Sequence, residues 1–263
     1  MKTESIVGRL WSTFYLVFLL FFVSCSNDLE SIEYVESEST TFIEDDVLMM
    51  QALGFDTSNI VDLESAYLIE GDILLEKDSP LLKQSRHAYH TTGLIGHPKQ
   101  REITVGVDSS IPTSGEDNWR SEVQNAIDLW NPLSNLKMTY TMGANPDILI
   151  RSDSGSLPNN TIAAASWPTN GNPGASIKVN LDFDSNKTIP SSQKLYNMVH
   201  ELGHCLGLRH TNWKIIGESE ANYIQGTPET DPNSVMNGGT ANSYWMGFSD
   251  GDKKAIEKLY PFF

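Results

Sequence analysis

Hydrophobic and polar residues alternate regularly in the second half of the chain. Ile103, Val105 and Val107 are each separated by one residue, which is the pattern of a strand with one buried face. The same alternation recurs later, at Ile177, Val179 and Leu181. Two further strand candidates are residues 137–141 and 147–152. This region therefore predicts a sheet of several strands.

Three helices are predicted beside the motif helix described below. The clearest carries bulky apolar residues on one face, namely Trp119, Val123, Ala126, Ile127 and Trp130. The tetrapeptide 113–116, Thr-Ser-Gly-Glu, precedes it and can form a capping box. A last helix is expected near 249–260 and a short one at 45–53. The order of elements is strand, helix, several strands, helix, loops, helix.

The first hundred residues have a different character. The net charge of the chain is −16, and residues 26–100 contain 15 Asp and Glu against 4 Lys and Arg. Residues 26–41, rich in Ser and Glu, predict a flexible tether. Residues 67–75 are strand-like with a turn inside them, and 87–100 predict a linker. The acidic balance argues against nucleic acid and anionic membrane surfaces as partners.

The first 25 residues resemble an export signal. Lys2 and Arg9 precede an apolar run at 14–23, which is short for a membrane span, and a small residue precedes Cys25. The pattern resembles a bacterial lipoprotein signal, which implies that Cys25 is lipidated. The protein would then lie on the outer membrane or cell surface, held through its lipid anchor only, until proteolysis releases it. The alternative is a plain secretory signal or a short anchor.

The sequence 200–210 reads His-Glu-Leu-Gly-His-Cys-Leu-Gly-Leu-Arg-His. Residues four apart on a helix share a face, so His200 and His204 can present two imidazole nitrogens to one ion. Glu201 lies beside that face, where its carboxylate can reach a metal-bound water. An apolar stripe lies nearly opposite and is predicted to pack on the core, formed by Leu195, Met198, Val199, Leu202 and Leu206.

A glycine explains how a third histidine joins the pair. Gly207 is free to adopt a positive φ and to end the helix, so the chain can turn and bring His210 to the same ion. Three neutral imidazoles leave a fourth position for water, as a catalytic zinc site needs. We therefore predict one catalytic Zn²⁺ ion. Cys205 is expected to be a small buried hydrophobe and not a ligand.

The full pattern resembles the metzincin signature and is most similar to the bacterial dual-action HEIGH-type metallopeptidases. The resemblance covers Arg101 to the C-terminus. It implies an α+β fold with an α/β-like upper subdomain, in which a mixed, mostly parallel twisted sheet carries the motif helix in a cleft. It also implies a loop-rich C-terminal subdomain with a methionine turn and a final helix. Met236, in Ser-Val-Met-Asn, fits the methionine turn.

Two positions depart from the astacin-like members of that group. Those proteins carry Glu after the third histidine and Tyr two residues past the methionine, whereas this chain has Thr211 and Gly238. A tyrosine that acts as fifth ligand or oxyanion donor is therefore not supported at the expected place. Tyr244 is a candidate substitute.

The resemblance implies a zinc endopeptidase that acts as a monomer on extracellular proteins or peptides, with zinc-activated water and Glu201 as general base. An extended substrate would add to an edge strand of the sheet, for which 163–167 is the candidate. One alternative is a lipid-anchored zinc-binding lipoprotein dedicated to one partner, without general proteolytic activity. Another is a surface adhesin, which rests on the lipid anchor alone.

A short motif in the acidic segment resembles an inhibitory element. Ile69-Glu-Gly-Asp72 is similar to the Phe-x-Gly-Asp motif of astacin pro-segments, whose aspartate occupies the zinc in the inactive precursor. This implies that Asp72 is a zymogen switch, removed by cleavage between Lys77 and Arg101. The alternative is that Gly71-Asp72 is only a hairpin turn in an accessory subdomain, and Ile69 in place of Phe favours it. The predicted division is a signal at 1–25, a tether and pro- or accessory segment at 26–100, and a catalytic domain at 101–263.

Overall fold

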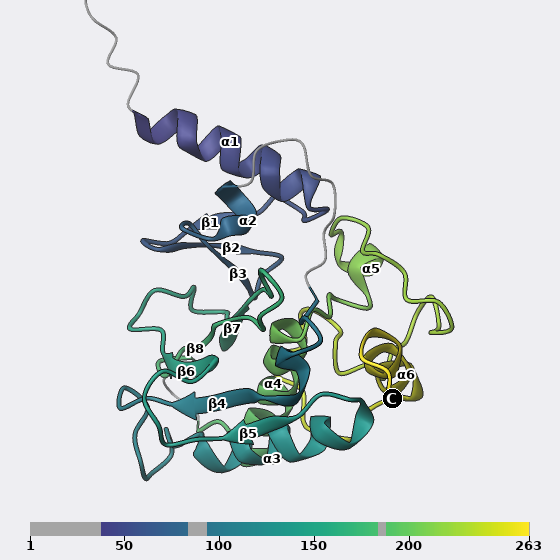
Figure 1. Cartoon of the computed structure of the whole chain (residues 1–263). Helices are drawn as coiled ribbons and strands as arrows, with labels where there is room; N and C mark the ends of the chain where they lie inside the picture. The colour runs from purple at the N-terminus through teal and green to yellow at the C-terminus, as the bar shows by residue number, and fades with distance from the viewer. Residues whose placement is uncertain (1–37, 84–93, 184–187, 263) are drawn as a thin grey trace, which may run out of the picture.

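The computed structural model describes residues 38–83, 94–183 and 188–262 (Figure 1). The predicted signal and Cys25 lie outside these residues. The strands are β1 (Val61–Asp62), β2 (Ala66–Ile69), β3 (Ile73–Glu76), β4 (Ile103–Val107), β5 (Met138–Tyr140), β6 (Ile148–Ser152), β7 (Ala163–Ser166) and β8 (Ser176–Val179). The helices are α1 (Glu38–Ala52), α2 (Pro80–Lys83), α3 (Arg120–Trp130), α4 (Ser191–Cys205), α5 (Trp213–Ile216) and α6 (Asp250–Leu259), with short 3-10 turns η1 (Lys99–Arg101) and η2 (Asn131–Leu133).

The eight described strands form one mixed sheet in the order β1-β2-β3-β7-β8-β6-β4-β5. The strands from β8 to β5 run parallel to their neighbours, whereas β7 is antiparallel to β8. β3 joins β7 in parallel, and β1, β2 and β3 form an antiparallel meander. The predicted α+β fold with a mixed, mostly parallel sheet is therefore confirmed.

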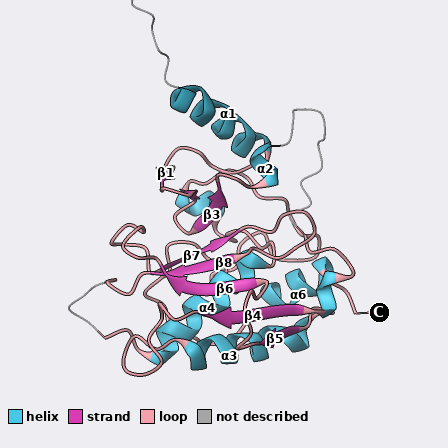
Figure 2. Cartoon of the chain, turned by 60° about the vertical axis from the view of Figure 1, so that its left-hand side comes forward, coloured by secondary structure: helices cyan, strands magenta, loops and turns pink. Residues whose placement is uncertain are grey.

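Helices α3 and α4 pack against each other and against the sheet (Figures 1 and 2). The predicted apolar face of α3 is buried, with Trp119 and Trp130 each 1% exposed. The indole Nε1 of Trp130 donates a hydrogen bond of 3.0 Å to the carbonyl of Val199 on α4. The predicted apolar stripe of α4 lies in the same core, with Leu195 only partly buried. The core therefore supports the helix that carries the motif.

The predicted substrate edge at 163–167 is a strand but not a free edge. β7 pairs with β8 on one side and with β3 on the other, in the register Ile73 to Ala165 and Leu74 to Ser166. The amide of Ala165 donates to the carbonyl of Asp72 at 2.8 Å. An unpaired strand edge readily accepts another apolar strand, and here the N-terminal segment supplies one. The expectation of a free edge is thus wrong in this form of the chain.

The predicted capping box at 113–116 does not form. Helix α3 begins at Arg120, and its N-cap residue, Trp119, makes no side-chain capping bond. Gly115 has a φ of +82°, which turns the chain before the helix starts. The Asn118 side chain accepts from the Arg120 amide at 3.1 Å instead. The tetrapeptide pattern is therefore a turn, and a short polar side chain next to the helix takes over the local bonding.

A capping box does form at α6, inside the predicted helix 249–260. The Ser249 hydroxyl accepts from the Asp252 amide, and the Asp252 carboxylate accepts from the Ser249 amide, both at 2.9 Å. The same carboxylate accepts from the Ser234 hydroxyl at 2.6 Å and from the Val235 amide at 3.0 Å. The N-terminus of α6 is thereby tied to the loop before Met236.

The N-terminal segment is more ordered than the sequence predicts. Helix α1 begins at Glu38, within the stretch expected to be a tether, and contains most of the short helix expected at 45–53. Phe55 packs edge-on against Trp167 at the end of β7, with ring centroids 5.4 Å apart. The expected linker 87–100 lies partly outside the described residues and ends in η1. Among the described helices, none is long and apolar enough to cross a membrane.

We predict that Ser249→Ala lowers the free energy of unfolding by about 1 kcal/mol, because it removes a formed N-cap. Thr113→Ala is the matched control, since the box predicted around Thr113 does not form, and its cost should stay below about 0.5 kcal/mol. Urea denaturation followed by circular dichroism measures both. Equal losses in the two variants would contradict the assignment of the caps.

Candidate metal centre

The motif 200–210 forms the end of α4 and the turn that follows it. Gly207 has a φ of +92°, as its predicted role requires. Its amide donates to the His204 carbonyl at 2.9 Å, and the Leu208 amide donates to the Gly203 carbonyl at 3.0 Å. These two bonds are the pattern of a Schellman motif, which closes a helix and redirects the chain. His210 thereby returns toward the helix that carries the other two histidines.

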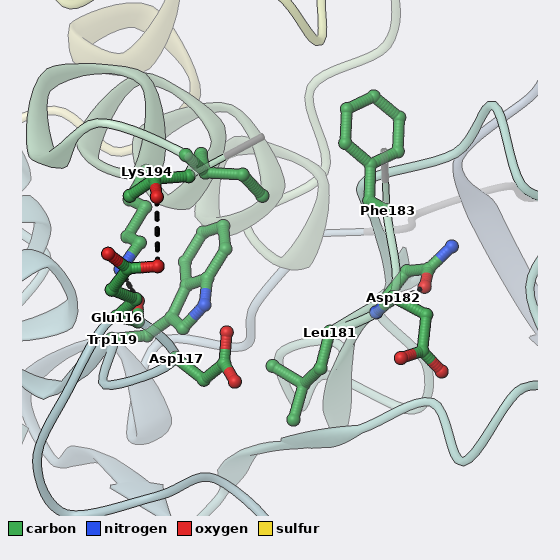
Figure 3. A pocket seen from close by; sticks show the side chains of 10 residues that line it. Glu116, Asp117, Trp119, Leu181, Asp182, Phe183 and Lys194 are labelled. Carbon is green, nitrogen blue, oxygen red and sulfur yellow. Dashed lines mark hydrogen bonds between the residues drawn. The ribbon is translucent and has the colours of Figure 1, made fainter. Parts of the chain in front are cut away.

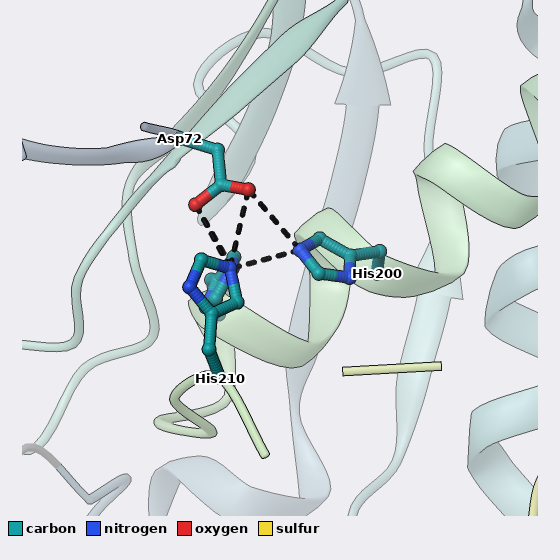
Figure 4. A group of neighbouring side chains, drawn as sticks. Asp72, His200 and His210 are labelled. Carbon is teal, nitrogen blue, oxygen red and sulfur yellow. Dashed lines mark hydrogen bonds and ion pairs between the residues drawn. The ribbon is translucent and has the colours of Figure 1, made fainter. Parts of the chain in front are cut away.

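The structure brings all three predicted histidines together, and Figure 4 labels His200 and His210. His200, His204 and His210 are 4%, 0% and 1% exposed. The Nε2 atoms of His200 and His204 are 3.0 Å apart. The ring of His210 lies 5.4 Å and 4.9 Å from those of His200 and His204, measured between centroids. Three imidazoles thus converge on one small volume.

Asp72 faces the same volume from the opposite side (Figure 4). Its carboxylate oxygens lie 3.3 Å, 3.5 Å and 3.1 Å from the Nε2 atoms of His200, His204 and His210 respectively. Asp72 belongs to the loop between β2 and β3, in which Glu70 and Gly71 both have positive φ. The segment is therefore a hairpin turn, as one interpretation of the sequence holds. Its carboxylate also reaches the histidines, as the other requires.

These four side chains fit a tetrahedral zinc ion. Zinc–nitrogen bonds of about 2.0–2.1 Å place ligand atoms about 3.3 Å from one another in a tetrahedron. The separation between the Nε2 atoms of His200 and His204 and the three separations from Asp72 run from 3.0 to 3.5 Å. Three imidazoles and one carboxylate are also donors that zinc accepts. Among the described residues, only one other group of acidic, histidine or cysteine side chains is as compact, and it shares His210.

The Nδ1 atom of each ring donates to a different part of the fold. His200 Nδ1 donates to the Val235 carbonyl at 2.6 Å, and His204 Nδ1 donates to the Leu208 carbonyl at 2.7 Å. His210 Nδ1 instead lies 2.8 Å and 3.0 Å from the two carboxylate oxygens of Glu218. The Nε2 atoms are therefore the ones that would bind an ion. Burial acts to lower the pKa of His210, but the Asp72 and Glu218 carboxylates raise it to about 10, so this ring would have to lose its Nε2 proton first.

Burial and charge set the protonation of the site. Burial lowers the pKa of His204 to about 4, against the opposing effect of Asp72, so this ring is neutral at pH 7. Burial acts to raise the pKa of Asp72, but the charge of His210 and hydrogen bonds from the imidazoles hold it well below its usual value. Glu201 is 1% exposed, and its Oε2 has no hydrogen-bond partner. Burial raises the pKa of Glu201 well above its usual range, and the Asp72 carboxylate raises it further.

Met236 lies directly beneath the histidine-bearing turn of α4. A Cβ atom added to Gly203 would come within 2.4 Å of the Met236 sulfur, so only glycine allows this approach. Met236 is 2% exposed, and its carbonyl accepts from the Thr211 amide at 2.9 Å. The residue before it supplies the carbonyl that holds His200. The predicted methionine turn therefore has the position that its role requires.

Neither position considered for a tyrosine ligand or oxyanion donor, Gly238 or Tyr244, places a tyrosine hydroxyl beside the histidines. At Gly238, a Cβ atom would lie 2.7 Å from His210 Nδ1 and 2.6 Å from Ile216, so no tyrosine fits there without displacing the ring. Tyr244 is 52% exposed, and the amide of its neighbour Trp245 donates to the Ser192 carbonyl. Ser192 precedes His200 by about 12 Å along the helix axis. The candidate substitute Tyr244 is thus remote from the histidines.

An ion pair beside the centre joins the N-terminal segment to the motif. Arg209 donates through Nε and Nη2 to the Glu70 carboxylate, which is fully buried. Arg209 also donates to the Gly54 carbonyl at 2.6 Å and lies over the Phe55 ring at 5.0 Å. Burial raises the pKa of Glu70, with Arg209 opposing that effect. The sequence alone gives no role to Glu70, Arg209 or Glu218, because no local motif indicates a contact between distant segments.

Two hollows differ in their relation to the centre. A cleft of about 970 Å³ is lined by His210, Trp167 and Met236, and on the N-terminal side by Phe55 and Leu81. A second hollow of about 420 Å³ lies near the start of α4 and is lined by acidic residues with Trp119 and Lys194 (Figure 3). Among the described residues, no group compact enough to share a metal ion lines the second hollow.

The chain is similar to several known proteins. A family model described as dual-action HEIGH metallo-peptidase matches residues 69–260, starting well before Arg101. Macrophage metalloelastase of Oryctolagus cuniculus is 29% identical over 138 residues, which are 47% of this chain and 29% of that protein, so the chain spans less than a third of this relative. Two structures of myroilysin align with TM-scores of 0.42 and 0.40, at 18% and 16% identity. They cover 64% and 65% of this chain and 80% and 84% of theirs.

We predict that the purified protein binds one zinc ion per chain and that His204→Ala does not, because it removes one of the converging nitrogens. His97→Ala is the control, since His97 is exposed and belongs to neither compact group. Elemental analysis after dialysis measures the zinc content. Full zinc retention by His204→Ala would contradict the site.

Proposed function

The chain belongs to the family of dual-action HEIGH metallo-peptidases, and from this membership we propose that it is a zinc-dependent endopeptidase acting on extracellular proteins. One observation carries the proposal. His200, His204 and His210 converge with their Nε2 atoms directed at one small volume, and Glu201 is buried on the helix that carries the first two, with its Oε2 unpartnered. This is the donor set of a catalytic zinc site with a base beside it.

The proposed mechanism gives each side chain one task. A bound zinc ion would supply the Lewis acid that activates water and polarises the scissile carbonyl. His200, His204 and His210 would hold it, because their Nδ1 atoms are fixed by acceptors. Glu201 would take the proton of the attacking water at its carboxylate and pass it to the leaving amine. Its burial favours this task, since a carboxylate that is not solvated by water is a stronger base.

Substrates are proposed to be extended protein or peptide segments. β7 ends at Ser166, and Trp167 after it lines the cleft beside His210. A polypeptide that pairs with β7 would run past the histidines, and strand addition gives affinity through backbone hydrogen bonds. β3 already pairs with β7 in this way, which supports the idea that the edge accepts a strand. Binding of substrate would therefore require that β3 leaves.

Asp72 is proposed to be the switch that keeps the precursor inactive. Its carboxylate lies within 3.5 Å of all three Nε2 atoms, where a water molecule would have to bind. The family match begins at Ile69 and so includes Asp72. Cleavage between Lys77 and Arg101 would release the segment, although residues 84–93 of that stretch lie outside the described residues.

Export and lipid attachment are proposed from the sequence alone. Cys25 and the signal precede the described residues, so the location on the outer membrane or cell surface rests on the pattern at 1–25. A monomer that acts on protein or peptide substrates, and not on nucleic acid, agrees with the net charge of −16. The alternative, a lipid-anchored lipoprotein that serves one partner without general proteolysis, would keep the same site.

We predict that Glu201→Gln lowers the rate of casein cleavage by at least about 100-fold, because the variant keeps the size of the side chain but cannot accept a proton. Protein lacking residues 1–25 is incubated with casein and with itself, and fragments are read by mass spectrometry. Glu102→Gln, at an exposed position outside the cleft, should retain the wild-type rate. A chelator should stop cleavage in every sample. If the wild type binds zinc but cuts nothing, the dedicated lipoprotein becomes the better explanation.

We predict that Asp72→Ala increases casein cleavage and speeds the loss of the N-terminal segment, because it vacates the position facing the three nitrogens. The increase should be partial, since β3 must still leave β7 before substrate can pair there, and the loss of Asp72 only weakens the binding of that segment. Initial rates and the time course of chain shortening measure the effect. Asp78→Ala, an exposed acidic residue in the same segment, should change neither. Unchanged activity and processing in Asp72→Ala would refute the switch.

A further inference from the structure

His210 differs from the other two histidines in what holds it. His200 and His204 lie on α4, whose backbone fixes their position, and their Nδ1 atoms donate to backbone carbonyls. His210 lies in the loop beyond Gly207, outside any helix or strand. Its Nδ1 has a carboxylate as partner, that of Glu218. The ring with the least backbone support is therefore the one whose Nδ1 has a charged partner.

Local structure explains how Glu218 reaches this ring. The short helix α5 (Trp213–Ile216) follows His210 and ends at Gly217, whose φ is +82°. This left-handed residue turns the chain, and the Glu218 amide donates to the Trp213 carbonyl at 2.9 Å. The Glu218 side chain is then 8% exposed, with its two oxygens 2.8 Å and 3.0 Å from His210 Nδ1. A single turn of helix thus returns the chain onto the ring.

We infer that Glu218 is a positioning residue for the metal, which fixes the ring of His210 with its Nε2 directed into the centre. A carboxylate that accepts the Nδ1 proton selects the tautomer whose Nε2 lone pair is free. It also makes the imidazole a better donor and prevents rotation of the ring. The inference rests on the proposed metal site but not on peptidase activity, because it concerns only how the third nitrogen is held.

The surroundings leave this task to Glu218 alone among the described acidic residues nearby. Asp72 contacts His210 at Nε2, and Glu70 is also close to the ring but accepts from Arg209 and from the Asp56 amide. On another side of the ring, Gly238 has no side chain, and a Cβ atom there would collide with His210 Nδ1. The lack of a side chain at this position gives the ring and its partner the space they occupy.

The contact lies within the part of the chain that would remain after processing. Glu218 and His210 both follow the motif helix, and the N-terminal segment contacts His210 only at Nε2, through Asp72, and not at the Nδ1 that Glu218 holds. Arg209 additionally donates to the Ser219 carbonyl at 3.3 Å, which ties the next residue to the motif. Loss of Asp72 and Glu70 would therefore leave the support of His210 in place.

The test is zinc affinity, measured on the full chain lacking residues 1–25 by competition with a chromophoric chelator. Glu218→Ala should weaken zinc binding about 10- to 100-fold, the usual effect of losing such a partner. Glu218→Gln keeps an oxygen acceptor for the Nδ1 proton and should recover part of that loss. Glu220→Gln, two residues away and exposed, removes the same charge and should bind zinc as the wild type does.

Two further readouts separate positioning from simple stabilisation of the loop. The melting temperature of the metal-free protein should be the same for Glu218→Gln and Glu220→Gln. The visible absorption of bound Co²⁺, which depends on ligand geometry, should change in Glu218→Ala and not in Glu220→Gln. If Glu218→Ala does not fold, the Glu218→Gln variant alone decides through its zinc affinity.

The outcomes are distinct. Zinc affinity equal to wild type in both Glu218 variants would overturn the inference and leave the metal site intact. An equal loss in Glu220→Gln would also overturn it, because net charge would then be the cause. If the wild type itself binds no zinc, the proposed metal site is wrong, and the inference about Glu218 is overturned with it.

Discussion

The centre depends on holding three imidazole nitrogens within 3.5 Å of the Asp72 carboxylate and within 4.8 Å of one another inside a buried volume. Rings so placed must each keep a proton on Nδ1 and find an acceptor for it, since an unpaired buried donor is costly. Three separate elements supply the acceptors. The helix-ending turn provides the Leu208 carbonyl, the methionine turn provides the Val235 carbonyl, and the chain after α5 provides the Glu218 carboxylate. The loop-rich C-terminal part is thus built around the needs of the rings.

The histidine-lined volume also explains why the acidic N-terminal segment lies against it. A carboxylate is a favourable occupant of this space when the His210 ring is charged, and Asp72 provides one. The second acidic residue of the loop, Glu70, is buried only because Arg209 of the motif pairs with it. Hydrogen bonding of β3 to β7 then sets how far into the cleft the loop extends. Each of these contacts joins residues more than ninety positions apart in the sequence.

Local patterns in the sequence predict the parts of the fold that local physics determines. The alternating strands, the apolar face of α3 and the 200–210 motif follow from periodicity, and Gly207 follows from the need for a positive φ. The pairing of β3 with β7 and the contact of Glu218 with His210 do not, because they depend on where the chain returns after a turn. The capping box at 113–116 fails for a related reason. Gly115 turns the chain before the helix begins, and the Asn118 side chain accepts from the Arg120 amide. The four residues of the box do not reveal either feature.

In the proposed precursor, Asp72 blocks the three histidines and β3 blocks the edge of β7, and the two contacts are chemically independent. Leu74 of β3 is fully buried in a cluster with Leu157 and Ala164, and burying one such side chain stabilises by about 1.5–3 kcal/mol. Loss of Asp72 alone therefore leaves the strand attached, and a cut in the chain alone leaves both contacts intact. A cut changes the effective concentration of the N-terminal segment at the cleft. A short linker holds the segment at an effective concentration of the order of millimolar, and a severed segment has only its bulk concentration. Processing would thus open the cleft by dissociation in dilute surroundings, without any change in the contacts themselves.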